Sequence, residues 1–297
     1  MKTRADEFSG LTVAMITPFK DGKLDFDVLQ EQVEFQVAPG TTAISPTGTT
    51  GESPTLTHEE QHEVIKKSVE FAAGRVKVMA GTGSNNTVEA LALTKYAEQA
   101  GADAALVIGP YYNKPTQEGM YRHFKLVAES VGIPICVYNV PGRTAKGIDA
   151  ETIIRLSEIK NIAMVKDATG SMDGASRILA ETDLTVLSGD DSLTLPFMSL
   201  GARGVVSVVG NFAPQDVIAL CAAMNSGNLA DARKFHEKLL PLSRGMLSLA
   251  TNPIPVKRAM QLLGRDSGEM RLPMTELEPG ATAKVRELLV EYGLLAQ

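Results

Sequence analysis

Short apolar runs of strand-like composition recur along this chain, and helical patterns separate most of them. The eight runs cover residues 12–19, 43–48, 76–83, 104–112, 134–139, 163–169, 185–191 and 204–211. The helical pattern at 58–73 has its apolar residues on one face, and Thr57 with Glu60 forms a capping-box sequence at its start. Nearly continuous apolar strands that alternate with helices predict a parallel sheet covered by helices on its faces.

Eight strand–helix units in about 225 residues predict an α/β fold of the (β/α)₈ TIM-barrel type. We therefore assign residues 1–225 to a barrel that carries the active site and residues 226–297 to a C-terminal helical region. Helices are expected at 215–225, 229–249, 255–263 and 275–292, of which the first completes the barrel and the others form a cap or an arm. A doubly wound open sheet is the alternative architecture.

Composition narrows the class of protein further. The chain has 297 residues, 44% hydrophobic and 22% charged, which is typical of one large globular domain. Its 29 basic and 35 acidic residues are dispersed, which argues against nucleic acid or a membrane surface as partner. The only two cysteines, Cys136 and Cys221, lie in apolar runs and are expected to be buried thiols in a reducing compartment. No apolar stretch reaches the roughly 18 residues of a membrane span, so we expect a soluble, cytoplasmic protein.

The residues suited to chemistry follow the strand-like runs. In a (β/α)₈ barrel the carboxyl ends of the strands and the loops after them carry the function. Glycines, hydroxyls, tyrosines and charged residues gather at six of these ends, in segments 48–52, 81–85, 110–113 and 138–144, at Lys166 and in 189–191. A barrel would bring all six to one rim, which is where we expect the active site.

Lys166 is the first candidate for the chemistry. It stands at the end of the apolar run 162–165, immediately before Asp167. An amine held there loses hydration, its charged form is disfavoured, and the neutral amine can attack a carbonyl carbon to form an imine. The alternative is a lysine that extends from the strand end into water.

The other segments at this rim also allow two readings. The loop Gly48–Gly51 is either a tight turn or a cradle whose N–H groups and hydroxyls hold a small carboxylate. Arg143, after Pro141-Gly142, is either an exposed loop residue or a guanidinium aimed at a carboxylate. Each of the three tyrosines, Tyr111, Tyr112 and Tyr138, taken alone is typical of a packing residue. Together, beside an amine, they could relay protons. Gly81-Thr82-Gly83 lacks the third glycine of a dinucleotide fingerprint, so no nucleotide is expected.

The sequence does not predict a metal site. The four histidines, His58, His62, His123 and His236, are scattered, and only His58 and His62 have helical i, i+4 spacing. These two lie among glutamates at the start of a helix, which indicates a solvated face. Asp190-Asp191 has no third ligand in register. We therefore expect neither a metal nor a cofactor.

Taken together, the motifs resemble a known family. They are 48–52 (Gly-Thr-Thr-Gly-Glu), Tyr111-Tyr112, 138–144, Lys166 before Asp167-Ala168-Thr169-Gly170, and 252–257 (Asn-Pro-Ile-Pro-Val-Lys). From about Gly10 to its C-terminus the chain resembles the pyruvate-dependent class I aldolases, the family that contains dihydrodipicolinate synthase (4-hydroxy-tetrahydrodipicolinate synthase) and N-acetylneuraminate lyase. The tyrosine pair and Arg143-Thr144 are typical of the synthases in that family.

The resemblance implies a mechanism that needs no cofactor. Lys166 would form an imine with pyruvate, and loss of a proton from carbon three would give an enamine. Tyr138 would be the general acid/base, connected through Thr49 to Tyr112 of a neighbouring subunit. A tyrosine that crosses between subunits implies an oligomer, and the family suggests a homotetramer built as a dimer of dimers.

The resemblance also implies the substrates. Thr49 and Thr50 would hold the pyruvate carboxylate, and Gly189 and Val206 would line that pocket. Arg143 would bind the carboxylate of aspartate semialdehyde, whose aldehyde is attacked before its amine displaces Lys166 and closes the ring of 4-hydroxy-tetrahydrodipicolinate, a step in lysine and diaminopimelate biosynthesis. The alternatives are a sugar-acid aldolase that uses the same imine, such as N-acetylneuraminate lyase or a 2-keto-3-deoxy sugar acid aldolase, and a non-catalytic barrel that binds a metabolite.

Two further sets of positions follow from the resemblance. Synthases of this family are often inhibited by lysine, and the residues that match the effector site are His58, Asn85, Glu89 and Tyr111. Gln61 replaces a histidine of some regulated relatives, which leaves inhibition by lysine open. Asp167 stands where many relatives have Glu, and we expect the shorter side chain to alter contacts around the site more than the mechanism.

Overall fold

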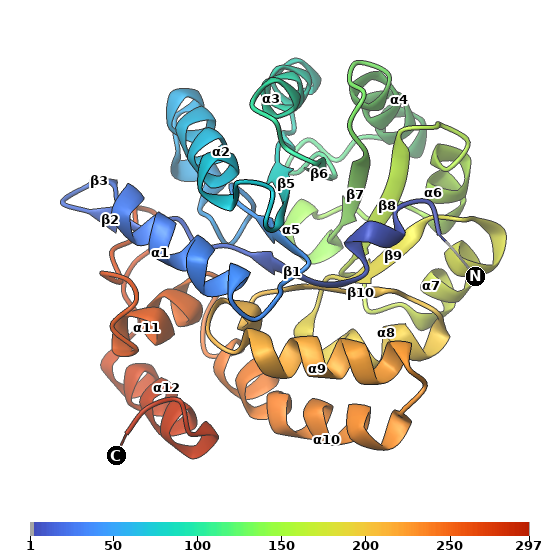
Figure 1. Cartoon of the computed structure of the whole chain (residues 1–297). Helices are drawn as coiled ribbons and strands as arrows, with labels where there is room; N and C mark the ends of the chain where they lie inside the picture. The colour runs from blue at the N-terminus through green and yellow to red at the C-terminus, as the bar shows by residue number, and fades with distance from the viewer. Residues whose placement is uncertain (1–2, 297) are drawn as a thin grey trace.

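The computed structural model describes residues 3–296, and eight parallel strands close into a barrel at its centre (Figure 1). Around the barrel the order is β1-β10-β9-β8-β7-β6-β5-β4, and β1 pairs with both β10 and β4. This closure confirms the predicted (β/α)₈ barrel and excludes the open sheet. The strands are β1 (Gly10–Ala14), β4 (Ala43–Ser45), β5 (Lys77–Gly81), β6 (Ala104–Ile108), β7 (Ile135–Asn139), β8 (Ile162–Asp167), β9 (Thr185–Ser188) and β10 (Gly204–Ser207).

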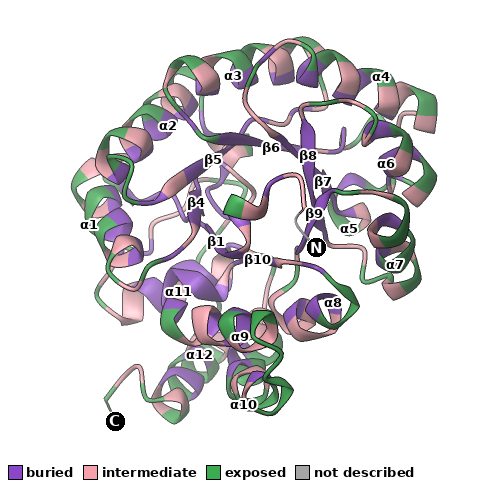
Figure 2. Ribbon diagram, turned by 45° about the vertical axis from the view of Figure 1, so that its right-hand side comes forward, coloured by how far each residue is buried: buried purple, intermediate pink, exposed green. Residues whose placement is uncertain are grey.

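Helices surround the strands, with their buried residues facing inward and their exposed residues facing outward (Figure 2). The capping box predicted at the start of α2 is present, since the Thr57 and Glu60 side chains each bond to the other residue's backbone N–H. A short hairpin of β2 (Phe19–Lys20) and β3 (Lys23–Leu24) follows β1. The helices of the barrel are α1 (Phe26–Val37), α2 (His58–Ala72), α3 (Thr87–Gln99), α4 (Gln117–Ala128), α5 (Pro141–Thr144), α6 (Ala150–Leu156), α7 (Met172–Glu181), α8 (Thr194–Leu200) and α9 (Pro214–Asn225).

Several strands are shorter than the apolar runs that predicted them. The run 204–211 is a strand only to Ser207, and Val209–Asn211 forms a 3₁₀ turn. The cause is Asp191, whose carboxylate accepts hydrogen bonds from the backbone N–H groups of Val208 and Val209. These N–H groups therefore bond to a side chain and not to a neighbouring strand.

The C-terminal region differs from its prediction in two helices. The expected helix 229–249 is α10 (Leu229–Leu240) followed by a π-helical turn at Pro241–Met246. Proline has no N–H and its ring collides with the preceding turn, so Pro241 ends the α-helical hydrogen bonding. The next helices are α11 (Ile254–Leu262) and α12 (Pro279–Tyr292), and α12 begins at a proline that suits the first helical position, four residues later than predicted.

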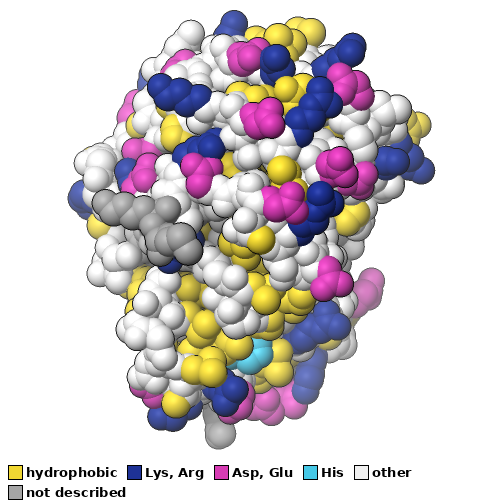
Figure 3. Space-filling model, turned by 90° about the vertical axis from the view of Figure 1, so that its right-hand side faces the viewer, with side chains coloured by type: hydrophobic (Ala, Val, Ile, Leu, Met, Phe, Trp, Pro, Cys, Tyr) yellow, Lys and Arg dark blue, Asp and Glu magenta, His cyan; other side chains and the backbone are white. Residues whose placement is uncertain are grey.

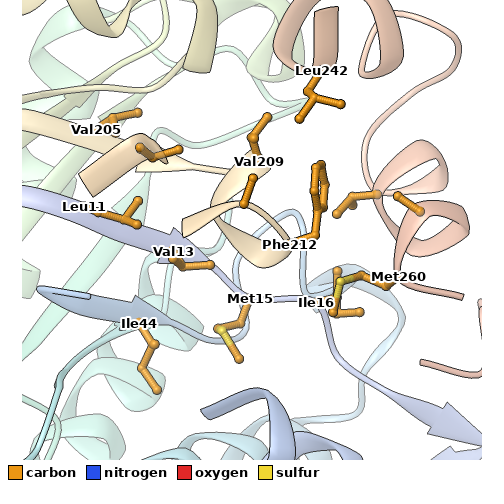
Figure 4. Close-up of a cluster of buried hydrophobic side chains, with 14 of the residues drawn as sticks. Leu11, Val13, Met15, Ile16, Ile44, Val205, Val209, Phe212, Leu242 and Met260 are labelled. Carbon is orange, nitrogen blue, oxygen red and sulfur yellow. The ribbon is translucent and has the colours of Figure 1, made fainter. Parts of the chain in front are cut away.

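The C-terminal helices share a hydrophobic core with the barrel. Leu11 and Val13 of β1, Val205 of β10, and Leu242 and Met260 of the C-terminal region belong to one buried cluster (Figure 4). The hairpin β2–β3 also meets this region, because the Gly22 N–H donates to the Glu269 carboxylate at 2.7 Å. The C-terminal helices are therefore fixed to one side of the barrel and can hold residues at its rim.

The N-terminal segment covers the opposite end of the barrel, the end at which the strands begin (Figure 2). Ala5 and Phe8 are buried in the cluster of side chains inside the barrel. The Arg4 guanidinium donates to the backbone carbonyl oxygens of Ser157 and Ile162, each at 2.7 Å. This end of the barrel is closed, so access to the interior is from the rim at which the strands end.

Other predictions about composition can be compared with the structure. Cys136 and Cys221 are free and buried, as predicted, and burial raises the pKa of both thiols to about 12. Figure 3 shows basic and acidic side chains interspersed on one face of the molecule. Among residues 3–296, no helix combines the length and the hydropathy that a bilayer crossing requires.

Asp266, between α11 and α12, gives a prediction about stability. Burial raises the pKa of its carboxyl from 3.8 to about 6, while Lys257 opposes the shift. The folded protein therefore holds this proton to higher pH than the unfolded chain, so stability falls as pH rises from about 4 to about 6. Asp266→Asn should raise the free energy of unfolding by about 1–3 kcal/mol at neutral or higher pH. Urea unfolding at about pH 8 and about pH 4.5 tests this, since the gain should shrink at the lower pH; a gain independent of pH would contradict it.

Candidate active site

Lys166 and Tyr138 lie side by side inside the barrel. They are register partners on β8 and β7, and each is only 6% exposed. Because side chains alternate along a strand, Lys166 lies on the same side of β8 as Met164, which belongs to the buried cluster inside the barrel. The Lys166 Nζ atom is 4.0 Å from the centroid of the Tyr138 ring. The amine is therefore held in a buried position beside a phenol and does not extend into water.

A cavity opens above this pair at the carboxyl ends of the strands. Its inner part has a volume of about 230 Å³, which suits a small metabolite and is less than the roughly 300–1,000 Å³ of sites for drug-sized ligands. It is lined by Thr49, Thr50, Tyr111, Tyr138, Arg143 and Lys166, among others. An outer part shares five of these residues and extends to Gly189, Asp190 and Arg244. The structure thus brings together side chains from most of the predicted strand ends, at the predicted rim.

The Gly48–Glu52 loop lines both parts of the cavity through Thr49 and Thr50. The Gly51 carbonyl oxygen accepts a hydrogen bond from the Thr17 hydroxyl at 2.7 Å. Gly81 lets the loop approach β5, because a Cβ there would lie only 2.4 Å from the Thr47 carbonyl oxygen. Thr50 Oγ1 accepts a hydrogen bond from Asn252 Nδ2 at 3.0 Å. Since that bond occupies a lone pair, the Thr50 hydroxyl hydrogen can be donated to an anion in the cavity.

Arg143 lies at the mouth, on the one-turn helix α5 that Pro141 begins. Its Nη2 atom donates to the Asn252 backbone carbonyl oxygen at 3.2 Å, and its side chain lines both parts of the cavity. A guanidinium has further N–H donors in one plane, which match the two oxygens of a carboxylate. This position suits a carboxylate that enters from the outer part of the cavity.

Asp167, the residue after Lys166, is held by hydrogen bonds within its own segment. Asp167 Oδ1 accepts hydrogen bonds from the Thr169 N–H and hydroxyl, at 2.8 and 2.7 Å. Burial raises the pKa of this carboxyl, and the bonds from Thr169 act against the shift. Gly189 passes close to the same segment, where a Cβ would lie 2.6 Å from Ala168 Cβ. Val206 is fully buried in the cluster inside the barrel.

The two aspartates after β9 have different surroundings. The Asp191 carboxylate accepts hydrogen bonds from the Ser207 hydroxyl and from the N–H groups of Val208 and Val209. Its role is therefore structural. Asp190 lines the outer part of the cavity; partial desolvation there raises the pKa of its carboxyl, and the charges of Lys166, Arg244 and Arg143 oppose this. Within residues 3–296, no three His, Cys, Asp or Glu side chains gather as metal ligands would.

Tyr112 lies outside the cavity of its own chain. Its side chain is 87% exposed, and its backbone has a φ of 71° in the loop after β6. Thr49 lines the cavity together with Tyr138. A single chain therefore brings together two of the three residues of the proposed relay, and the contribution of Tyr112 from a neighbouring subunit stays a prediction.

The residues that match the effector site lie in several segments. Tyr111 lines the inner cavity, and Glu89 accepts hydrogen bonds from Ser84 and Asn86. The Asn85 carbonyl oxygen accepts a hydrogen bond from Asn113, and His58 is exposed at the start of α2. Among the hydrogen bonds of residues 3–296, none joins His58 to the other three. Gln61 is 6% exposed and donates to the Ser53 carbonyl oxygen. The effector role of His58, Asn85, Glu89 and Tyr111 stays a prediction.

Analysis of the sequence did not assign roles to three residues near the site. Asn252 contacts both Thr50 and Arg143, Arg244 of the π-helical turn lines the mouth, and Lys257 bonds to Glu52. Two of them, Asn252 and Lys257, belong to the motif 252–257 on which the family resemblance partly rests. The structure shows that Arg244 and Asn252, from this part of the chain, line the outer part of the cavity.

Comparisons with known proteins agree with this geometry. A model of the Dihydrodipicolinate synthetase family matches residues 7–292. The 4-hydroxy-tetrahydrodipicolinate synthase of Syntrophus aciditrophicus is 47% identical over 290 residues, which is 97% of this chain and 99% of the relative. The crystal structure of dihydrodipicolinate synthase from Aquifex aeolicus has a TM-score of 0.96 at 51% identity, covering 98% of this chain and all of that one. The chloride-inhibited synthase from Acinetobacter baumannii, solved in complex with pyruvate, has a TM-score of 0.94 at 41% identity, covering 97% and 100%.

Proposed function

Because the chain belongs to the Dihydrodipicolinate synthetase family, we propose that it condenses pyruvate with L-aspartate 4-semialdehyde to give 4-hydroxy-tetrahydrodipicolinate, in lysine and diaminopimelate biosynthesis. The observation that carries the proposal is the buried Lys166 amine, 4.0 Å from the centroid of the Tyr138 ring, in a cavity that also presents Arg143. The structure of a relative with pyruvate bound supports pyruvate as the donor.

The first half of the reaction uses the inner cavity. The Lys166 amine attacks the keto carbon of pyruvate, water leaves, and the resulting imine withdraws electrons from carbon three. Loss of a proton from that carbon gives the enamine. Tyr138, whose ring centroid lies 4.0 Å from the amine, moves protons as the imine forms. The hydroxyl of Thr50 and the loop around Thr49 hold the carboxylate, so the keto carbon lies near Nζ.

The second half uses the mouth. Arg143 binds the carboxylate of aspartate semialdehyde, and carbon three of the enamine attacks the aldehyde carbon. This forms a carbon–carbon bond and restores the imine, while the aldehyde oxygen takes up a proton and becomes the hydroxyl of the product. The amine of the acceptor then attacks the imine carbon, closes the ring and releases Lys166, which regains its proton. The imine is the electron sink in this scheme, so the reaction requires neither a cofactor nor a metal.

We also propose a homotetramer in the cytoplasm. The 87% exposure of Tyr112 on a loop beside the site fits a side chain that enters a neighbouring subunit's cavity. The free thiols Cys136 and Cys221 fit a reducing compartment.

The acceptor specificity separates this function from the sugar-acid aldolases. A coupled assay with pyruvate should give turnover with aspartate semialdehyde and, by comparison, little with N-acetylmannosamine or small aldoses. Arg143 is the structural reason, since it offers a charged site for the acceptor carboxylate. Higher kcat/KM with a sugar aldehyde would refute the synthase and leave the aldolase.

Arg143→Ala gives a sharper test of the acceptor site. The variant should still form the imine, because Lys166 and Tyr138 keep their positions. Its kcat/KM for aspartate semialdehyde should fall by about 10²- to 10³-fold, as expected for loss of a charged partner of a carboxylate. Arg122→Ala is the matched control, since Arg122 is exposed on α4 and pairs with Glu118. If turnover of Arg143→Ala is like that of the control, the assigned role of Arg143 is wrong.

A further inference from the structure

Lys257 and Glu52 form a buried ion pair between the C-terminal region and the barrel. Their side chains are 0% and 1% exposed, and Lys257 Nζ lies 2.9 Å from Glu52 Oε1. Lys257 also donates to the carbonyl oxygens of Thr17, at 2.9 Å, and of Glu269, which uses all three of its N–H donors. The second oxygen of Glu52 accepts from the Arg271 N–H at 3.1 Å. All three N–H donors of Lys257 and both carboxylate oxygens of Glu52 therefore have a hydrogen-bond partner.

Stability alone is a weak reason to bury such a pair. Removing two charges from water costs several kcal/mol per ion, and well-packed neutral residues at such positions often give equal or greater stability. The location of the pair suggests a different role. Glu52 is the last residue of the loop that carries Thr49 and Thr50, and its N–H donates to the Thr49 carbonyl oxygen at 3.2 Å.

The Glu52 backbone needs support from its surroundings. Its φ of 53° and ψ of 33° lie in the left-handed region, which a non-glycine residue adopts only when neighbouring groups hold it there. The buried ammonium of Lys257 holds the side chain of this residue. Since the Glu52 N–H bonds to Thr49, the conformation of Glu52 sets where Thr49 lies at the cavity.

The segment that begins α11 contacts the loop at a second point. Asn252, five residues before Lys257, donates from Nδ2 to Thr50 Oγ1 at 3.0 Å. The loop is thus fixed at Thr50 by Asn252 and at Glu52 by Lys257. These two contacts are made by residues about 200 positions away in the sequence, on a segment that belongs to the shared core.

We propose that Lys257, acting through Glu52, is a positioning residue that holds Thr49 and Thr50 in the geometry required to bind the carboxylate of the 2-oxo acid donor. The proposal rests on the proposed function, because it takes these threonines as the donor site. Loosening the pair should weaken binding of pyruvate. It should affect binding of the acceptor much less, because Arg143 stands on α5.

The test uses Lys257→Met, Glu52→Gln and the double variant in the full chain. Each single variant leaves one buried charge unpaired and should lower Tm, whereas the double variant buries no charge and should recover most of the lost Tm. In the double variant, KM for pyruvate and the Kd of pyruvate by calorimetry should stay raised about tenfold, as expected from the loss of charge-assisted hydrogen bonds. Its KM for aspartate semialdehyde should stay within about threefold of wild type.

Arg4→Met is the matched control for lost stability. Arg4 bonds to backbone carbonyl oxygens at the opposite end of the barrel, so this variant should lower Tm and leave the Kd of pyruvate unchanged. A double variant that recovers both Tm and the wild-type Kd would show that the pair only stabilises the fold, and the proposal would be wrong. Failure of the proposed function would give a different result: the wild-type protein would bind pyruvate but would not turn over aspartate semialdehyde. If wild type does not bind pyruvate, both are refuted.

Discussion

Lys166→Met is expected to abolish imine formation with pyruvate and to lower kcat/KM by at least about 10³-fold. Methionine is unbranched and nearly as long as lysine, so it can pack against the Tyr138 ring without the amine. Removing an amine from a position that is 6% exposed should leave Tm unchanged or higher. A coupled assay measures the loss of kcat/KM, and a thermal scan measures Tm.

The control for this variant is Lys160→Met, which removes an exposed lysine two residues before β8. It should keep wild-type activity, because it lies at the end of the barrel where the strands begin. If Lys166→Met also kept its activity, the chemistry would have to be carried by another group, and the assignment of this lysine as nucleophile would fail.

Tyr138→Phe is expected to slow imine formation by about 10²- to 10⁴-fold, the usual contribution of a general acid/base. Phenylalanine keeps the ring whose centroid lies 4.0 Å from Lys166 Nζ, so packing around the amine should be preserved. The loss should therefore appear in the rate of imine formation and much less in the Kd of pyruvate. Time courses of borohydride-quenched samples, analysed by intact mass, give this rate directly.

Tyr121→Phe is the matched control for loss of a phenol hydroxyl. Tyr121 lies on α4, where its ring stacks on the Arg155 guanidinium, away from the cavity. This variant should form the imine at the wild-type rate. Equal rates for Tyr138→Phe and the control would refute the role of Tyr138 in proton transfer.

The features that the sequence predicted correctly depend on local patterns. A buried strand shows as an apolar run and an amphipathic helix shows as a repeat, so the eight strands and the position of Lys166 at the end of β8 could be recognised. Parallel connectivity then placed the loop around Thr49 and the turn around Arg143 at the same rim, where the structure has them.

The features that the sequence did not predict depend on contacts between distant residues. The bonds of Asn252 to Thr50 and of Lys257 to Glu52 join residues more than 200 positions apart, and no local pattern marks either partner. The end of β10 at Ser207 depends in the same way on the Asp191 carboxylate. The π-helical turn was missed although Pro241 marks its start, because the apolar pattern continues through the proline.

Borohydride reduction in the presence of pyruvate, followed by peptide mass mapping, tests the central claim that a buried amine captures a 2-oxo acid inside the barrel. We expect one reduced pyruvate adduct per chain, on the peptide that contains Lys166, and none on that peptide in Lys166→Met. No adduct, or an adduct on a different lysine, would contradict the claim.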